Sequence, residues 1–238
     1  MEFIFAAMYK LIRSFFFLFD AEKVHYFAMN ALHFFCSIGF IRKLLAASFQ
    51  PTAKNLAVEK WGLEFKNPVG LAAGFDKNAK YLRELEVLGF GFVEIGTVTP
   101  KPQDGNDKPR LFRLPKDKAI INRMGFNNDG QAAALQRLRR RKDRAEKGVV
   151  GVNIGANKDS SDRIEDYAQG VRAMAPVADY LTLNISSPNT PGLRALQDKG
   201  ALEALLDGVA AAQPANAAVP IFLKVAPDLE PADIDDIV

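Results

Sequence analysis

From residue 51 onward, short apolar runs alternate with stretches of helical periodicity, and this alternation constrains the fold more than any other feature. The apolar runs cover residues 69–73, 91–98, 149–154, 180–185 and 220–225, each bounded by Gly, Pro, Asn or Ser. Helical patterns lie near residues 79–88, 129–146, 163–177 and 201–212, a further helix starts at Pro231, and residues 55–65 resemble a small hairpin. Apolar strands separated by helices predict parallel βα units, either in an open doubly wound sheet or in a (β/α)8 barrel.

The placement of polar residues favours the barrel. A polar group follows each predicted strand: Asp76-Lys77, Thr97, Asn153, Asn184 and Lys224. Barrel active sites are built at the carboxyl ends of the strands, so this is the layout expected of one. No G-x-G-x-x-G follows the first strand, which weakens the dinucleotide-binding alternative. A complete barrel takes roughly 250 residues, so the sequence predicts an incomplete α/β barrel with about five of the eight strands.

Residues 1–49 are predicted to form a separate helical unit that precedes a barrel domain at residues 50–238. The unit holds 11 of the 18 phenylalanines, both histidines and Cys36, and Asp20 marks a helix break or N-cap. Residues 24–41 carry no formal charge, which is borderline for a membrane span.

Five polar residues nevertheless recur every three or four positions in this unit and form a stripe on one helix face: Glu22, Tyr26, Asn30, His33 and Ser37. Three interpretations stay open: packing on the chain's own domain, lying in a membrane interface, and a true span or signal. The stripe and the Phe-rich faces favour the interface.

The rare residues restrict the chemistry of the main body. No His or Cys occurs after residue 49, which excludes Ser-His, Cys-His and His-metal chemistry there. A single cysteine excludes a disulfide framework, and the net charge of +3 does not argue for nucleic acid. The basic run at residues 137–144 lacks interleaved aromatics and is interpreted as a solvated helix face, with attraction to anionic lipid headgroups as a secondary interpretation.

The predicted strand ends carry neutral amides instead. Asn122, Asn153 and Asn184 each follow an apolar residue in the same way, and Asn127, Asn128, Asn157 and Asn189 lie nearby. Amides offer donor and acceptor together, which suits the edges of flat heterocycles, although turn formation is the alternative. Lys77 and Lys224 are either anion ligands or solvated rim charges. A site this poor in acid–base groups leaves the difficult step to a cofactor, with Ser186 and Ser187 as the candidate proton acceptors.

Seven short runs, among them EIGTVTP and NISSPNTPG, together resemble the quinone-dependent (class 2) dihydroorotate dehydrogenases. They lie in family order at residues 67–77, 94–100, 105–113, 122–128, 153–158, 184–192 and 224–228. The resemblance implies a (β/α)8 barrel that binds FMN and oxidises dihydroorotate to orotate. In that reaction a base takes the C5 proton while a hydride leaves C6.

The resemblance also assigns roles to residues. Ser187 matches the catalytic base, and Thr190 and Phe126 match positions that border the proton relay. The implied substrate-binding residues are Lys77, Asn122, Arg123, Met124, Gly125, Phe126, Asn184 and Asn189. The implied FMN-binding residues are Ala73, Gly74, Phe75, Asp76, Lys77, Thr97, Asn153, Asn184 and Lys224, and no metal site is expected.

Residues 1–49 would give a membrane quinone access to the flavin, in a peripheral protein on the cytoplasmic side of the inner membrane. The expected partners are dihydroorotate or orotate, the quinone and the membrane surface, without nucleic acid. Two alternatives stay open. One is another FMN-dependent barrel oxidoreductase acting on pyrimidines. The other is a catalytically inactive truncated fragment, because the flavin phosphate cradle of a barrel typically follows strands seven and eight.

Overall fold

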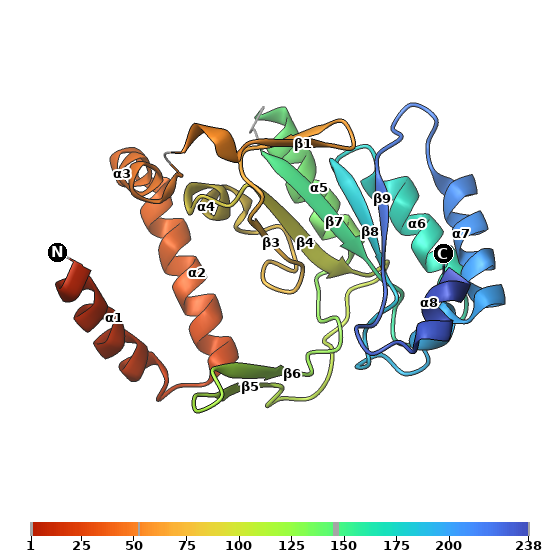
Figure 1. Cartoon of the computed structure of the whole chain (residues 1–238), viewed down its shortest axis with the longest axis horizontal. Coiled ribbons are helices and arrows are strands. Elements are labelled where there is room, and N and C mark those ends of the chain that lie inside the picture. The colour runs from red at the N-terminus through yellow and green to blue at the C-terminus, as the bar shows by residue number, and fades with distance from the viewer. Residues whose placement is uncertain (1, 52, 145–147, 238) are drawn as a thin grey trace.

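The computed structural model of the chain describes residues 2–51, 53–144 and 148–237 (Figure 1). Its helices are α1 (Glu2–Phe16), α2 (Ala21–Ser37), α3 (Gly39–Phe49), α4 (Leu82–Val87), α5 (Gln131–Asp143), α6 (Arg163–Met174), α7 (Lys199–Ala212) and α8 (Pro231–Ile237), with short 3-10 turns η1 (Lys54–Leu56) and η2 (Arg194–Gln197). Its strands are β1 (Val58–Lys60), β2 (Leu63–Phe65), β3 (Gly70–Leu71), β4 (Phe92–Val98), β5 (Leu111–Leu114), β6 (Ala119–Asn122), β7 (Val149–Ile154), β8 (Tyr180–Asn184) and β9 (Ile221–Lys224). All five strands predicted for the sheet are present.

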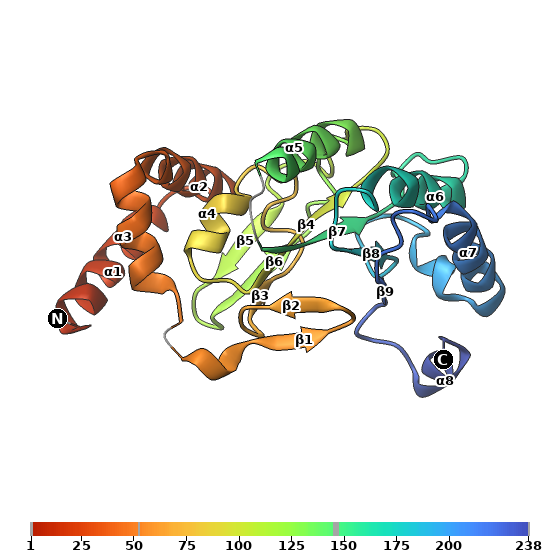
Figure 2. The same ribbon diagram turned by 90° about the horizontal axis from the view of Figure 1, so that it is seen from above.

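The central sheet is parallel and its strands follow chain order, β3-β4-β7-β8-β9. Helices α5, α6 and α7 all lie on one side of it, as the view from above shows (Figure 2). A doubly wound sheet would reverse its strand order and carry helices on both faces. The sheet is therefore a run of consecutive (β/α) barrel units, which confirms the predicted α/β fold.

Alternation along the strands explains which side meets the helices. In β7, Val150, Val152 and Ile154 are buried in the core that the sheet shares with α5, α6 and α7. Successive side chains of a strand point to opposite faces, so Gly151 and Asn153 lie on the inner face. A Cβ at Gly151 would come within 2.0 Å of the Tyr180 ring, which places Tyr180 on the inner face as well.

Aromatic rings close the amino-terminal end of the inner face. Edge-on contacts with centroid separations of 4.8–6.5 Å link Trp61 and Phe65 of the β1–β2 hairpin with Phe92, Tyr180 and Phe222 of the sheet. These rings line a cavity of about 500 Å³ that also reaches Glu94, Thr182 and Lys224. The sheet thus has an aromatic floor and, at its other end, a polar rim.

Helix α2 begins as predicted and ends earlier than residues 24–41 suggested. The Asp20 carboxylate accepts a 2.9 Å hydrogen bond from the Lys23 amide as the N-cap. Ile38 has extended backbone, so α2 stops at Ser37 and α3 leaves at a bend of 113°. No single helix among the described residues has the length and apolar composition to cross a bilayer, although α2 and α3 together meet that criterion as a bent pair.

Three of the five residues in the polar stripe of α2 contact the barrel domain. Glu22, Asn30 and His33 contact Arg110, Tyr81 and Glu84 respectively, at 2.7, 2.7 and 3.1 Å. Three rings of the same helix are 48–63% exposed, those of Phe27, Phe34 and Phe35. A surface helix normally does the reverse. Helix α2 therefore packs on its own domain and still leaves an apolar face outward.

Candidate active site

Four polar side chains lie at the carboxyl ends of adjacent strands, as the sequence predicts. Thr97 belongs to β4, Asn153 to β7, Asn184 to β8 and Lys224 to β9. The first three are 5%, 0% and 4% exposed, whereas Lys224 is exposed. Asn184 and Lys224 are register partners, so the rim continues from β8 to β9.

Hydrogen bonds join the buried members of the rim into a chain. The Thr97 hydroxyl donates to Asn153 Oδ1 at 2.6 Å, and Asn184 Nδ2 donates to Thr97 Oγ1 at 3.0 Å. Asn184 Oδ1 in turn accepts from the hydroxyl and the backbone N–H of Ser186, at 2.7 and 3.2 Å. Each contact joins a donor to an acceptor, so these four hydrogen bonds run in one consistent direction along the rim.

Two donors are left over at this rim. A side-chain amide carries two N–H groups, and Asn153 and Asn184 each use one, toward Glu94 and Thr97. The second N–H of each amide has no partner in the part of the chain that the structure describes. Buried donors of this kind need an acceptor. The rim therefore fits a flat heterocycle with acceptor atoms on its edge, such as the flavin expected from the resemblance.

The loop after β3 brings a lysine to the same end of the sheet. Gly74 has φ +107°, and its N–H donates to the Gly96 carbonyl at 2.8 Å, which ties the loop to β4. The half-buried Lys77 ammonium lies 3.9 Å from where a Cβ on Gly74 would stand. Burial, aided by the Arg110 guanidinium, lowers the pKa of Lys77 to about 8. Ala73 and Phe75 are partly exposed beside it.

Asp76 holds this loop in place and has no carboxylate oxygen to spare. Its two oxygens accept three backbone N–H bonds, from Asn78, Lys80 and Tyr81. Burial raises its pKa even though these donors oppose the shift. The backbone carbonyl of Asp76 accepts from Gly96 N–H at 3.3 Å. Asp76 thus supports the predicted cofactor loop by fixing the conformation of its backbone.

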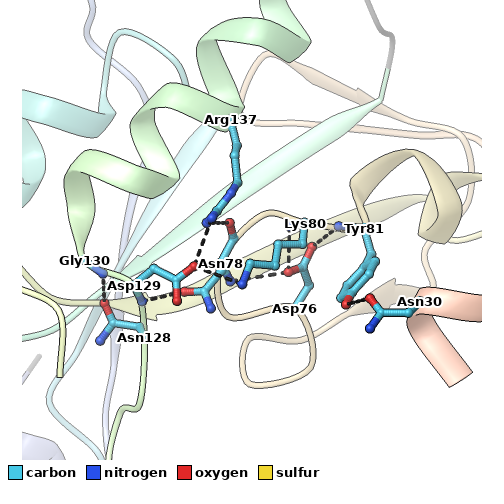
Figure 3. Close-up of polar contacts among 9 residues, drawn as sticks. All are labelled: Asn30, Asp76, Asn78, Lys80, Tyr81, Asn128, Asp129, Gly130 and Arg137. Carbon is cyan, nitrogen blue, oxygen red and sulfur yellow. Dashed lines mark hydrogen bonds and ion pairs between the residues drawn. The ribbon is translucent and has the colours of Figure 1, made fainter. Parts of the chain in front are cut away.

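Contacts on both sides of the loop fix it further (Figure 3). The Tyr81 phenol reaches Asn30 of α2 at 2.7 Å, on the side of the amino-terminal helices. On the other side, Lys80 and Arg137 converge on the Asp129 carboxylate at 3.0 and 2.9 Å. The loop that carries Lys77 is therefore anchored to α2 and to α5.

Asn122 is not placed like Asn153 and Asn184, and the prediction that it ends a similar strand is wrong. It ends β6, which pairs with β5 in a separate antiparallel sheet, and it is exposed. The Arg110–Glu22 pair ties this hairpin to α2 instead. An apolar run followed by Asn reads alike in both settings, because the run itself does not show whether it pairs in a local hairpin, as β6 does, or in the parallel sheet, as β7 and β8 do.

The rest of the predicted substrate segment follows this hairpin. Asn122 Oδ1 accepts the Met124 N–H at 3.0 Å, and the buried Met124 is followed by Gly125 at φ +73°. Phe126 then reaches the rim, because a Cβ on Gly155 would lie 2.6 Å from Thr97 and 3.1 Å from the Phe126 ring. The exposed Arg123 side chain lies over Phe112, away from this contact.

The loop after β8 brings Ser187 toward the same segment. Ser187 is half-buried, and its Oγ accepts the Asn189 N–H at 3.2 Å. Asn189 Nδ2 donates to the Asn122 carbonyl at 3.3 Å, so two predicted substrate residues meet across the loop. The Tyr167 phenol donates to the Asn184 carbonyl at 2.7 Å beneath it, and Thr190 is buried.

Sequence reasoning missed two residues of this region. Glu94 is the charged residue of the otherwise uncharged strand β4, and it accepts the Asn153 amide at 2.8 Å. A carboxylate in such a strand is costly unless it is hydrogen-bonded, and this was an available signal. His25 of α2 lies edge-on to Phe75 with ring centroids 4.6 Å apart, and burial lowers its pKa. No pattern in the sequence around His25 predicts that contact.

Comparison with known proteins yields a consistent result. A family model described as dihydroorotate dehydrogenase matches residues 55–238. The dihydroorotate dehydrogenase (quinone) of Sphingopyxis alaskensis is 61% identical over 98% of this chain, and that of Novosphingobium aromaticivorans is 57% identical over 96%. This chain covers 63% and 64% of those two proteins, so it spans less than two thirds of their length.

Solved structures agree. The crystal structure of DHODH from Eimeria tenella in complex with ferulenol superposes with a TM-score of 0.74 at 40% identity, covering 92% of this chain and 62% of that one. The ligand-free form from the same organism gives 0.71 at 42% identity, covering 83% and 63%.

Proposed function

The chain belongs to the dihydroorotate dehydrogenase family, and from that premise we propose that it serves the oxidation of (S)-dihydroorotate to orotate in pyrimidine biosynthesis. FMN is the proposed hydride acceptor and a membrane quinone the final electron acceptor. The observation that carries the proposal is the rim at the carboxyl ends of β4, β7 and β8, where two buried amides each keep one N–H for a ligand.

Nine residues are proposed to hold the flavin. They are Ala73, Gly74, Phe75, Asp76, Lys77, Thr97, Asn153, Asn184 and Lys224. When bound, FMN supplies the hydride acceptor that these side chains lack. Asn153 and Asn184 would donate to it through their spare N–H groups. Lys224, exposed at the end of β9, would balance negative charge at the rim.

The substrate is proposed to bind among Lys77, Asn122, Arg123, Met124, Gly125, Phe126, Asn184 and Asn189. Lys77 would pair with the substrate carboxylate, and that contact would raise its pKa again. The Asn122–Asn189 contact supports a shared pocket, because it joins the hairpin to the loop after β8.

Ser187 is proposed to take the C5 proton at Oγ. The Asn189 N–H holds that oxygen at 3.2 Å and leaves the hydroxyl hydrogen free to pass onward. A serine alone is a weak base, so the proton needs an outlet. The buried Thr190 and the Phe126 ring would border that outlet and limit access of bulk water.

Residues 1–49 are proposed to act as a quinone-access unit attached to a barrel domain at residues 50–238. Outward rings on α2 and on its neighbours, such as Phe15 and Phe40, would meet the acyl boundary of a membrane. The contact between His25 and Phe75 joins this unit to the proposed flavin loop. We place the protein at the membrane periphery, on the cytoplasmic side of the inner membrane.

Absorbance spectroscopy of the purified protein tests the proposal. A flavin band near about 450 nm that dihydroorotate bleaches under anaerobic conditions is the expected result. Bleaching by other pyrimidines but not by dihydroorotate would favour another pyrimidine-acting flavin barrel. No band on the protein after incubation with FMN and removal of the unbound flavin would contradict the proposal and favour an inactive fragment.

A further inference from the structure

Glu94 places a carboxylate on the inner face of the sheet, between the aromatic floor and the polar rim. Its Oε1 accepts Asn153 Nδ2 at 2.8 Å, and its Oε2 accepts the Tyr180 and Thr182 hydroxyls at 3.1 and 3.0 Å. Burial and the adjacent Glu94 raise the pKa of Tyr180 far above its ordinary value, so the phenol stays a donor. Both carboxylate oxygens are thus engaged by neighbouring strands.

Hydrogen-bond chemistry makes this carboxylate one end of a directed chain. An ionised carboxylate only accepts, so the Asn153 amide must turn its nitrogen to Glu94 and its oxygen to Thr97. The Thr97 hydroxyl must then donate to Asn153, and its lone pair accepts Asn184 Nδ2. At the other end of the chain, the backbone N–H of Ser186 can only donate, and it donates to Asn184 Oδ1. Glu94 at one end of the chain and the Ser186 N–H at the other therefore favour the same orientation of the Asn153 amide, and Glu94 is the end that contacts Asn153 directly.

We propose that Glu94 is a positioning residue that orients the Asn153 amide so that its spare N–H faces the flavin site. This inference rests on the proposed function, because the ligand in question is the flavin. The competing account is that Glu94 only ties β4 to β7 and β8. That account predicts lower stability after substitution without any selective effect on Asn153.

Three variants separate the two accounts. Glu94→Leu removes the acceptor. Glu94→Gln keeps it, because the amide oxygen can accept Asn153 while the amide nitrogen donates to the Tyr180 and Thr182 hydroxyls, which can reverse. The matched control is Glu84→Leu: Glu84 is also buried and bonded, to His33 and Arg83, but it lies on α4 away from the rim.

The first measurement uses flavin-free protein, so it does not depend on the proposed function. Side-chain amide resonances of Asn153, identified by their loss in Asn153→Asp, report its hydrogen exchange. Exchange should be slow in the unmodified protein and in Glu94→Gln and Glu84→Leu. In Glu94→Leu it should be faster by about tenfold or more, as expected for the loss of one buried hydrogen bond. Unfolding midpoints of the two Leu variants check that both remain folded.

The second measurement is FMN affinity by fluorescence quenching. Glu94→Leu should bind about tenfold more weakly or worse, whereas Glu94→Gln and Glu84→Leu should stay close to the unmodified protein. Unchanged Asn153 exchange in Glu94→Leu would overturn the inference, as would equal loss in Glu84→Leu or in Glu94→Gln. Should the unmodified protein fail to bind FMN, the proposed function fails, while the exchange data still decide the role of Glu94.

Discussion

Helix α2 and the central sheet bury polar groups in opposite ways. In the sheet, residues such as Val152 and Leu183 face the helices, while Glu94 and Asn153 face inward. In α2, polar side chains such as Glu22 bond to the barrel and rings such as Phe34 face outward. The sheet is held by apolar burial, whereas α2 adds polar contacts to the apolar burial of Met29 and Cys36. Because these contacts lie on the side of α2 that meets the barrel, they do not depend on whether water or an apolar medium lies outside the helix.

The strand ends and the amino-terminal helices also differ in what they leave available to a ligand or partner. At the strand ends, the side-chain amides of Asn153 and Asn184 each keep one N–H that can bond to a ligand. Helices α1, α2 and α3 instead carry exposed apolar side chains. A polar small molecule suits the first and a lipid boundary suits the second. The two proposed partners therefore belong to different surfaces, which adjoin where His25 of α2 contacts Phe75.

The largest effect is expected at the strand ends. Ser187→Ala should slow flavin reduction by dihydroorotate by about 10²–10⁴-fold, the usual loss for a general base, with FMN and orotate still bound. Stopped-flow absorbance measures the rate, and Ser161→Ala, an exposed serine in the loop after β7, is the control. An unchanged reduction rate would remove Ser187 from the mechanism.

Next in size is the ion pair that attaches α2. Glu22→Ala leaves Arg110 buried and unpaired, so it should lower the unfolding free energy by about 3–5 kcal/mol in urea titrations at pH 7. The pKa of Glu22 is lowered, chiefly by the hydrogen bond from Arg110. The contribution is therefore present above its ordinary value of 4.5 and lost as the pH falls through the lower folded value.

The matched comparison is Glu165→Ala on the barrel helix α6. That residue pairs with Arg172 in an exposed setting, with side-chain exposures of 57% and 49%. Its loss should change stability by only about 0–1 kcal/mol. Equal effects of the two substitutions would contradict a polar attachment of α2.

A smaller effect concerns Lys77. The unliganded pKa is about 8, so the ammonium that would pair with the substrate carboxylate is lost above that pH. Orotate affinity should be flat below about pH 7.5 and should fall by about tenfold per pH unit above the pKa. Lys77→Arg should remove this dependence. A profile for the unmodified protein that stays flat to pH 9 would show that Lys77 does not meet the ligand.

The lowered pKa of Lys77 also makes the free energy of unfolding depend on pH. A lysine whose folded pKa lies below its ordinary value of 10.5 destabilises the fold while it is charged. The unfolding free energy of the ligand-free protein should therefore rise from about pH 8 to pH 10.5 through this group. Lys77→Met should flatten that rise.

The five sheet strands were predictable because they are continuous apolar runs between turn residues, as in the match of residues 149–154 with β7. Asn153 and Asn184 were predictable for the same reason: they stand at the ends of such runs. The inward orientation of Glu22 could not be predicted from the sequence, because its partner Arg110 lies 88 residues away. Asn122 misled for a different reason: its strand pairs locally in a hairpin, and hairpin and sheet strands share one local pattern.

The smallest effect per residue is expected on the outer face of α2. Replacing Phe27, Phe34 and Phe35 with Gln should weaken binding to lipid vesicles by a few-fold per ring, on the order of 1 kcal/mol each, in sedimentation assays. Leu206→Gln on α7, 42% exposed at present, should leave binding unchanged. Substitution is preferable to deleting residues 1–49, which would strip Arg110 of its partner. Vesicle binding unaffected by all three replacements would place the membrane contact elsewhere.

The most direct test of the account compares two electron acceptors in the same preparation. The Phe27, Phe34 and Phe35 triple variant is reduced with dihydroorotate and then offered either a long-tailed quinone in vesicles or a small soluble dye. We expect electron transfer to the quinone to fall by about a hundredfold, in step with the loss of vesicle binding from all three rings together, while transfer to the dye stays unchanged. Equal rates to both acceptors before and after substitution, or an equal fall for both, would contradict it.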